Sequence, residues 1–279
     1  MPRSIALLSV LLALSEPVAR AAPAYAPTLG QSGKDVPWVP TPEPLVDRML
    51  TMAQVGPGDL VIDLGSGDGR TVVAAAKKFG ARAIGIEYDA RLVAHARQRA
   101  AQAGLRAPRV QFIQGDIYEA DFSGATVITL YLMPIINKRL RPTLLNMRPG
   151  TRVVSHQFAM DDWSPDETSY LGARTAHLWL IPARVAGTWQ LTLPNGSDAE
   201  LTLDQKYQRI SGRVRYGDIQ AGLREAQLRG DSIRFRLVDQ AGRTNDFSGR
   251  VDGDSMTGTV FAGGKAVPWT ATRVPAAPP

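Results

Sequence analysis

The chain of 279 residues has no cysteine, 3 histidines and, beyond its first residues, no apolar run long enough to cross a bilayer. The absence of cysteine excludes a disulfide framework, a thiolate nucleophile and cysteine-ligated zinc. The scarcity of histidine argues against a metal site. We therefore expect neither a metal nor a stable membrane span once the leader described next has been removed.

The first residues predict an export leader. Arg3 precedes an apolar run over residues 5–14, which is too short for a mature membrane-spanning helix. Small residues that suit a signal peptidase follow, so we expect cleavage between Ala21 and Ala24. Residues 1–24 are thus predicted to be a signal peptide, and the mature chain to be periplasmic or secreted. The alternatives are an uncleaved anchoring segment or a start codon placed too far upstream, and a nonfunctional leader would leave the chain cytoplasmic.

The formal charge of +6 gives only a weak preference for anionic partners. Arginines and acids interleave over residues 206–273, so no single basic stripe stands out. We therefore expect no nucleic-acid partner.

A segment rich in Pro, Gly and Ser over residues 25–40 predicts an extended arm. A helix signal follows, because Thr41 suits an N-cap, Pro42 suits the first helical position and Glu43 favours the positive end of the helix. The helix is expected to end near residues 56–58, where Gly-Pro-Gly stands.

Strands and helices then alternate at the spacing of a parallel α/β sheet. Strands are expected at residues 60–64, 83–87, 110–114, 127–132, 152–158 and 175–181, with helices at 71–79, 89–103 and 134–147. Such a sheet is buried on both faces and binds its ligand beyond the carboxyl ends of its strands. We expect this α/β domain to span residues 41–182.

A glycine-rich turn follows the first strand, in the run Asp-Leu-Gly-Ser-Gly-Asp-Gly-Arg over residues 63–70. Gly65, Gly67 and Gly69 allow the backbone to turn sharply and to approach a ligand near the free amides of the next helix. A dinucleotide fingerprint would place its third glycine at position 70, where this chain has arginine.

Two acids stand at the ends of the next strands. Glu87 ends the second strand about twenty residues after the glycine turn, where a carboxylate accepts from both ribose hydroxyls of a nucleoside. Asp116 follows the third strand and is placed to accept from an adenine amino group, with Ile117 packing on the ring. Each element alone also suits a turn or a capping acid, but the three in order are far more specific.

These motifs resemble those of the class I methyltransferases. Together with Trp-Val-Pro-Thr-Pro at residues 38–42 and Val-Val-Ser-His at 153–156, they are most similar to the group that contains the ATP synthase c-subunit lysine methyltransferase and its bacterial relatives. The resemblance implies a Rossmann-like seven-stranded sheet and S-adenosylmethionine as cofactor. It implies that Asp63, Gly65, Gly67, Glu87 and Asp116 bind this cofactor and that Thr41 or its neighbours close over the methionine moiety. Ser66 of the glycine turn and Ile117 complete the set of cofactor-binding candidates.

The acceptor side lacks the Asn-Pro-Pro-Tyr signature of adenine and glutamine methylases, which argues against base methylation. Tyr131 stands at the corresponding strand end, where it would orient an incoming amine, or it is a core tyrosine with a satisfied hydroxyl. His156 would take a proton or is structural. These two are the catalytic candidates, and with Trp38 and Phe158 they are the candidate lining of an acceptor channel. Fold analogy places the polar loop at 161–166 near the entrance of this channel.

Residues 187–274 change to short alternating strands and predict a separate β domain. Strands are expected at residues 188–193, 199–207, 210–216, 221–229, 232–239, 244–251, 255–261 and 267–273. Eight strands joined in sequence suggest an up-and-down barrel or a curved meander. Trp189 near its start and Arg273 near its end resemble the lipocalin arrangement, in which an arginine closes over a tryptophan. The interior is expected to be filled by side chains and the domain to serve docking or stability, with a ligand cavity as the alternative.

Two hypotheses on function follow. The first is an active methyltransferase acting on an amine, most simply a protein lysine, with a small molecule as the other acceptor. The second is an inactive exported binding or scaffold protein that keeps the fold, because S-adenosylmethionine is made in the cytosol.

Overall fold

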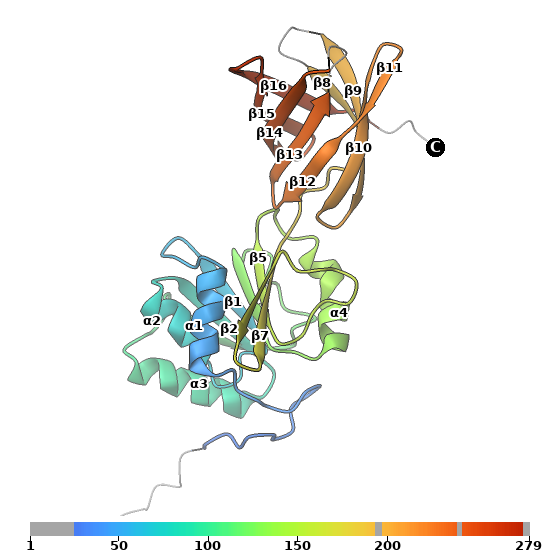
Figure 1. The fold of residues 1–279 in the computed structure, drawn as a ribbon. Coiled ribbons are helices and arrows are strands. Elements are labelled where there is room, and N and C mark those ends of the chain that lie inside the picture. Colours follow the sequence, from blue (N-terminus) through green and yellow to red (C-terminus); the bar gives the residue numbers. More distant parts are fainter. Residues whose placement is uncertain (1–24, 193–196, 239–241, 276–279) are drawn as a thin grey trace, which may run out of the picture.

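The computed structural model describes residues 25–192, 197–238 and 242–275, so the predicted signal peptide lies outside the described residues. An α/β domain and a β domain follow each other along the chain (Figure 1). The helices of the α/β domain are α1 (Glu43–Met52), α2 (Arg70–Lys78), α3 (Ala90–Gln102) and α4 (Pro134–Leu144). Its strands are β1 (Leu60–Leu64), β2 (Arg82–Glu87), β3 (Val110–Gln114), β4 (Val127–Leu130), β5 (Arg152–His156), β6 (Glu167–Leu171) and β7 (Arg174–Leu180).

These seven strands form one sheet in the order β3-β2-β1-β4-β5-β7-β6, which confirms the predicted Rossmann-like fold. Strands β1 to β5 are parallel, and β7 runs antiparallel between β5 and β6. β6 lies in a segment for which the sequence predicted no strand. Its mixed burial explains why no regular alternation marks it.

Along each central strand, successive side chains point alternately into two hydrophobic cores, one on each face of the sheet. Val61 packs with α1, α2 and α3 on one face, whereas Ile62 and Leu64 pack with α4 on the other. Figure 1 shows the same division, with α4 alone on its side of the sheet. The parallel strands therefore end together at one edge, which is called the carboxyl edge below.

The start of α1 differs from the prediction. The helix begins at Glu43, Pro42 holds the N-cap position, and no side chain caps the first amides. Thr41 does not act as a cap because its hydroxyl hydrogen bonds to the imidazole of His156.

The β domain contains nine antiparallel strands that curl into a nearly closed barrel (Figure 1). They are β8 (Gly187–Thr192), β9 (Asp198–Lys206), β10 (Arg209–Tyr216), β11 (Ile219–Gly222), β12 (Arg224–Arg229), β13 (Ser232–Val238), β14 (Thr244–Asp252), β15 (Ser255–Ala262) and β16 (Lys265–Arg273). The first and last strands pair, as in an up-and-down barrel. Its interior is filled by a buried cluster that includes Trp189, Phe235, Phe247 and Trp269.

The barrel has one strand more than expected because the predicted strand at 221–229 is divided. β11 pairs only with β10, and β12 only with β13, with a register shift between Arg224 and Gln227. The break itself falls at Leu223, between β11 and β12, and Glu225 inside β12 takes a left-handed φ of 48° at the register shift. β11 and β12 are therefore the two unpaired edges of the barrel sheet, although the alternation pattern predicted one continuous strand there.

The predicted Trp189–Arg273 pair is present. The guanidinium of Arg273 lies 4.2 Å from the centre of the Trp189 ring and donates to the carbonyls of Arg184 and Ala186. It thus fixes the linker that enters the barrel.

The β domain joins the α/β domain at the edge opposite the carboxyl edge (Figure 1). Ala183 N donates to Gly230 O, and Gly230 lies against Gly150, which precedes β5. Trp163 stacks on Tyr207 and donates from Nε1 to Gln208. The barrel is therefore remote from any ligand bound beyond the carboxyl ends of the strands.

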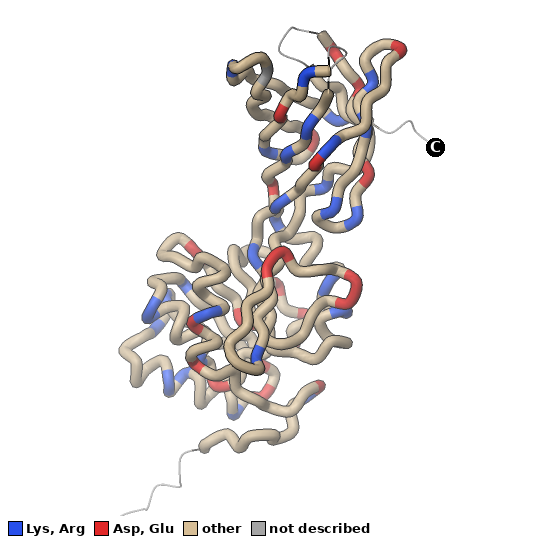
Figure 2. The backbone as a smooth tube through the Cα atoms, in the orientation of Figure 1, with Lys and Arg blue, Asp and Glu red and all other residues tan. Residues whose placement is uncertain are grey.

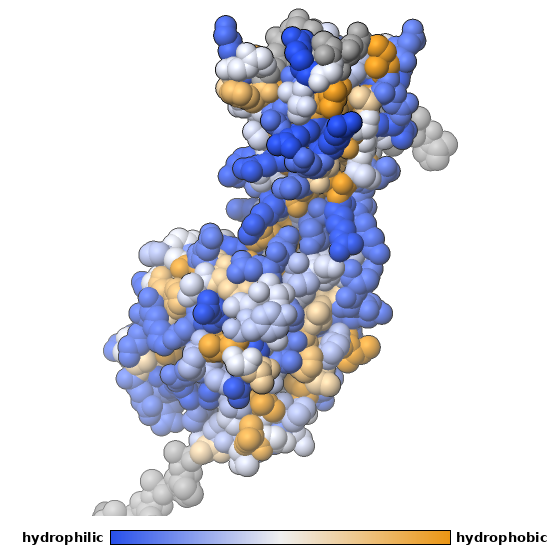
Figure 3. Space-filling view, in the orientation of Figure 1, coloured by the Kyte–Doolittle hydropathy of each residue, from blue (hydrophilic) through white to orange (hydrophobic). Residues whose placement is uncertain are grey.

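Charges on the surface are interspersed, with Lys and Arg alternating with Asp and Glu over both domains (Figure 2). Apolar side chains gather towards the lower edge of the α/β domain, whereas the visible face of the β domain is mostly hydrophilic (Figure 3). Among the helices of the described residues, none has the length and apolarity needed to cross a membrane.

Candidate active site

A pocket opens at the carboxyl edge, between the ends of the strands and the N-terminal arm. It is lined by all eight predicted cofactor-binding residues and by Tyr131. Residues 33–41 of the arm form its cover, and the enclosed cavity measures about 120 Å³. This is less than the 300 Å³ or more that small-molecule sites usually offer.

The glycine turn between β1 and α2 forms the floor of this pocket. Gly65, Gly67 and Gly69 all have left-handed φ values, of 76°, 53° and 76°. A Cβ on Gly67 would come within 2.7 Å of Nε1 of Trp38, so only glycine leaves room for the indole above the turn. Trp38 thus lies over the glycine turn, and it lines the same pocket as Tyr131. The hydroxyl of Ser66 is buried without a hydrogen-bond partner in the described structure.

Glu87 reaches from the end of β2 to the glycine turn. Its Oε2 accepts from Gly67 N and its Oε1 from Asp89 N, each at 2.9 Å. Two backbone amides therefore fix the carboxylate, and Glu87 lines the pocket. This is the arrangement that the ribose-binding prediction requires.

Asp116 stands after β3 and is held by its own turn, because Oδ1 accepts from Tyr118 N at 3.0 Å. Its other oxygen forms an ion pair with Lys34 of the arm, whose ammonium also lies 4.9 Å from the centre of the Tyr88 ring. The Lys34 ammonium holds the pKa of Asp116 below its ordinary value. The arm therefore reaches the carboxylate predicted to bind adenine, and Ile117 lines the same part of the pocket.

Asp63 lies at the base of the pocket and is almost fully buried. Burial raises its pKa to about 7, although Thr129 donates to its Oδ1 at 2.6 Å and opposes that shift. The nearby carboxylates of Glu87 and Asp68 add to the rise. A positively charged ligand group nearby would stabilise the ionised carboxylate of Asp63 and lower its pKa again.

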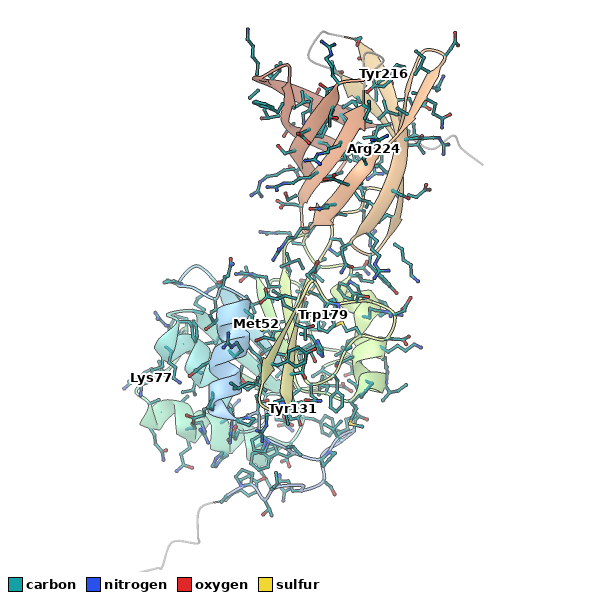
Figure 4. The ribbon with its side chains drawn as sticks, in the orientation of Figure 1. Met52, Lys77, Tyr131, Trp179, Tyr216 and Arg224 are labelled. Carbon is teal, nitrogen blue, oxygen red and sulfur yellow. The ribbon has the colours of Figure 1, made fainter. Side chains whose placement is uncertain are left out.

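The two catalytic candidates meet at the ends of β4 and β5. The rings of Tyr131 and His156 lie 3.8 Å apart between centres, and the ring of Phe158 lies nearly parallel to Tyr131 at 6.1 Å. Tyr131 also lines the pocket, and Figure 4 places it at the carboxyl edge beside the arm. Its hydroxyl meets no hydrogen-bond partner within the part of the chain that the structure describes, which argues against a core tyrosine.

His156 has a different role from the predicted proton acceptor. The ring is 3 % exposed, does not line the pocket, and hydrogen bonds through Nδ1 to Thr41 Oγ1 at 3.0 Å. Burial, with a contribution from Arg174, lowers its pKa to about 4. A neutral ring of such low basicity is a poor base at neutral pH, so we assign His156 to holding Tyr131.

An ion cluster beneath the glycine turn was not expected from the sequence. Asp68 is 3 % exposed and accepts from both Arg70 and Arg99. Burial alone would raise its pKa, but the two guanidinium groups bring it below the ordinary value. The only signal in the sequence is an acid and an arginine two residues apart inside the turn.

The polar loop at 161–166 does not line the acceptor entrance as expected. Asp162 accepts from Tyr207 and Arg141, and the indole of Trp163 is fully buried at the contact with the β domain. Because the chain turns back along α4 after Phe158, this loop joins the two domains. In the described part of the chain, no three His, Asp or Glu side chains converge to hold a metal.

Known proteins share these features. A family model described as the ANTKMT methyltransferase domain matches residues 63–167. A protein-lysine N-methyltransferase of Saccharolobus islandicus is 42% identical over 134 residues, which is 47% of this chain and 83% of that protein. The ATP synthase c-subunit lysine N-methyltransferase of Mus musculus is 34% identical over 153 residues, and the match spans 53% of this chain and 60% of the mouse protein.

A solved structure is similar as well. It is described as an RNA methyltransferase from Salinibacter ruber in complex with S-adenosyl-L-homocysteine. The two chains are 53% identical, with a TM-score of 0.51, over 53% of this chain and 96% of that one. The likeness therefore covers about half of this chain.

The residues present fit S-adenosylmethionine. The unpartnered Ser66 hydroxyl and the open glycine turn suit the close approach of a ligand, while Glu87 and Asp116 suit the ribose and the adenine. When bound, this cofactor supplies a methyl group activated by a sulfonium. The chain belongs to the family of S-adenosylmethionine-dependent protein-lysine N-methyltransferases.

Proposed function

We propose that this protein methylates the side-chain amine of a lysine in another protein. The observation that carries the proposal is the aromatic edge of the pocket, where the rings of His156 and Phe158 both lie near Tyr131, whose hydroxyl is unpartnered among the described residues. The names of the Saccharolobus and mouse relatives support a lysine acceptor. Methyl transfer needs alignment and exclusion of water more than it needs a nucleophilic residue, and this edge offers both.

A lysine must lose its proton before it attacks a methyl group. Desolvation beside the rings of Tyr131 and Phe158 would lower the pKa of the ammonium, which favours the neutral amine. The neutral His156 adds no positive charge that would repel the acceptor. The proton leaves to solvent before the attack, and in this proposal the Tyr131 hydroxyl orients the amine lone pair.

Exposed apolar side chains beside the pocket favour a large acceptor over a small one. Val39 of the arm, and Met133 and Ile135 at the start of α4, are 40 %, 44 % and 72 % exposed. They neighbour the pocket residues Trp38, Leu132 and Ile136 in the chain. Exposed apolar patches beside a site are typical of surfaces that bind another protein.

The test is transfer of tritiated methyl groups from S-adenosylmethionine to an extract of source cells that lack this chain. We expect label that is sensitive to protease and resistant to nuclease, and lysine residues heavier by one methyl group in mass spectrometry. Label in RNA, as the name of the Salinibacter relative would imply for that protein, or only in small molecules would overturn the proposal.

Substitution at the channel sharpens this test. Tyr131→Ala should lower the rate of transfer by about 100-fold, because misplacement of about 1 Å costs that much, while cofactor affinity is kept. Tyr170→Ala is the matched control, since Tyr170 is 72 % exposed on β6 and does not line the pocket. Equal rates for the two variants would exclude Tyr131 from the channel.

We also propose that the mature chain is exported. The support is the leader pattern at residues 1–24, together with the absence of cysteine. Fractionation of source cells and the N-terminal mass of the purified chain test it, with a new N-terminus between Ala21 and Ala24 expected. A full-length chain in the cytoplasmic fraction would overturn it.

A further inference from the structure

A series of contacts joins the glycine turn to the acceptor edge through the last residue of the arm. Arg70 Nη1 donates to the backbone carbonyl of Thr41 at 3.1 Å. The Thr41 hydroxyl shares a hydrogen bond of 3.0 Å with Nδ1 of His156, whose ring lies against Tyr131. Thr41 thus contacts Arg70 of the glycine turn through its backbone carbonyl, and His156 at the acceptor edge through its side chain.

Arg70, the first residue of this series, is itself rigidly held. Arg70 donates from Nε and Nη2 to both oxygens of Asp68, at 3.0 Å and 2.7 Å, and Arg99 donates to the same carboxylate at 2.9 Å. Paired donors in a fixed fork hold a guanidinium more firmly than an ammonium is held. Because Asp68 is buried, its attraction to Arg70 is little screened by solvent.

Tyr131, the last residue of this series, makes no side-chain hydrogen bond in the described part of the chain. Tyr131 lies after β4, outside the hydrogen-bonded ladder of the sheet, and its hydroxyl has no partner among the described residues. The closest ring contact of Tyr131 is with His156, at 3.8 Å between centres, so this contact decides where the ring stands. A shift of Thr41 would move His156 and release Tyr131.

We propose that Arg70 is a positioning residue for methyl transfer, which sets Tyr131 at the acceptor channel through Thr41 and His156. This inference rests on the proposed function, because it takes Tyr131 as the residue that meets the acceptor. The cofactor cradle and the acceptor edge are then aligned by one residue of the arm. Thr41 and Arg70 also line the cofactor pocket, so loss of the link weakens cofactor binding to some extent but lowers the maximal rate of transfer more.

The experiment compares Arg70→Lys and Thr41→Val with matched controls. Arg70→Lys keeps the positive charge beside Asp68 but removes the fork that also reaches Thr41. Its control is Arg91→Lys, because Arg91 pairs with Asp89 at the same spacing, at the start of the next helix. Thr41→Val removes only the hydroxyl, and Thr41→Ser restores it.

Initial rates are measured as methyl groups incorporated into the deletion-strain extract, with S-adenosylmethionine varied. Arg70→Lys and Thr41→Val should each lower the maximal rate about tenfold, with KM for the cofactor within about threefold of the parent. The double variant should be little slower than either single variant, because both break one series of contacts. Thr41→Ser should lose less than Thr41→Val. A rise in KM alone, or losses that multiply in the double variant, would overturn the proposal.

A second measurement does not depend on transfer. The chain has three histidines, so their ring nitrogen signals in a labelled sample can be assigned individually by nuclear magnetic resonance. His156 signals should move in Arg70→Lys and Thr41→Val and stay in place in Arg91→Lys, with melting temperatures checked for each variant. An unmoved His156 in folded Arg70→Lys would overturn the link, whereas a parent without protein-lysine transfer would overturn only the proposed function.

Discussion

Replacement of Glu87 by glutamine tests the cofactor site most directly. The carboxylate accepts from Gly67 N and Asp89 N at 2.9 Å each, and Glu87 lines the pocket. A glutamine presents one oxygen and one NH₂ group. In either orientation, the NH₂ group faces a backbone donor and withdraws one acceptor from the ribose.

The size of the effect follows from the bonds lost. A hydrogen bond to a charged group contributes about 1.5–3 kcal/mol, so loss of about 2 kcal/mol predicts about 30-fold weaker binding. Calorimetric titration with S-adenosylmethionine and S-adenosylhomocysteine measures it at one salt concentration. Glu119→Gln is the control, because Glu119 is an exposed acid in the turn after β3. An unchanged Kd for folded Glu87→Gln would refute the assignment of this carboxylate to the cofactor.

Three further outcomes are expected. Gly67→Ala should abolish detectable cofactor binding in the same titration, because its Cβ would displace Trp38, whereas Gly104→Ala, with φ of 74° and open space around it, measures backbone strain alone. Asp63→Asn should raise the melting temperature more at pH 8 than at pH 5: the pKa of Asp63 is raised to about 7, so its contribution to stability is present below the ordinary pKa of 3.8 and lost as pH rises through 7. A pH-independent difference would contradict this. Trp163→Ala should cost about 3–5 kcal/mol and divide the thermal transition in two, since its buried indole joins the domains, and calorimetry that still shows one transition would contradict it.

Local sequence patterns were sufficient to predict which residues line the pocket, because these residues stand in short segments at the strand ends. The turn with Gly65 and Gly67 directly follows β1, and Glu87 and Asp116 end the next two strands. Since parallel strands end at one edge, their order in the sequence already brings these groups together. All eight predicted cofactor-binding residues line one pocket for this reason.

Patterns failed where a residue has two plausible partners. Thr41 precedes a helix and was expected to cap it, but the structure brings His156, 115 positions away, within hydrogen-bond distance of its hydroxyl. The loop at 161–166 is polar and follows the acceptor edge, yet the β domain draws Asp162 and Trp163 to the opposite end. The extended run at 221–229 contained no signal for the break at Leu223 that divides it into β11 and β12.

The sequence by itself determined the α/β sheet, the barrel and the residues that line the pocket at the carboxyl edge, because periodicity, turn chemistry and strand order are local properties. Only the tertiary structure decided that Lys34 meets Asp116, that Arg70 reaches Thr41, and that the β domain stands away from the pocket. Those contacts join segments that are distant in the chain, and long side chains such as lysine and arginine reach partners that no spacing rule specifies. The low basicity of His156 belongs with them, because burial is a property of the folded chain.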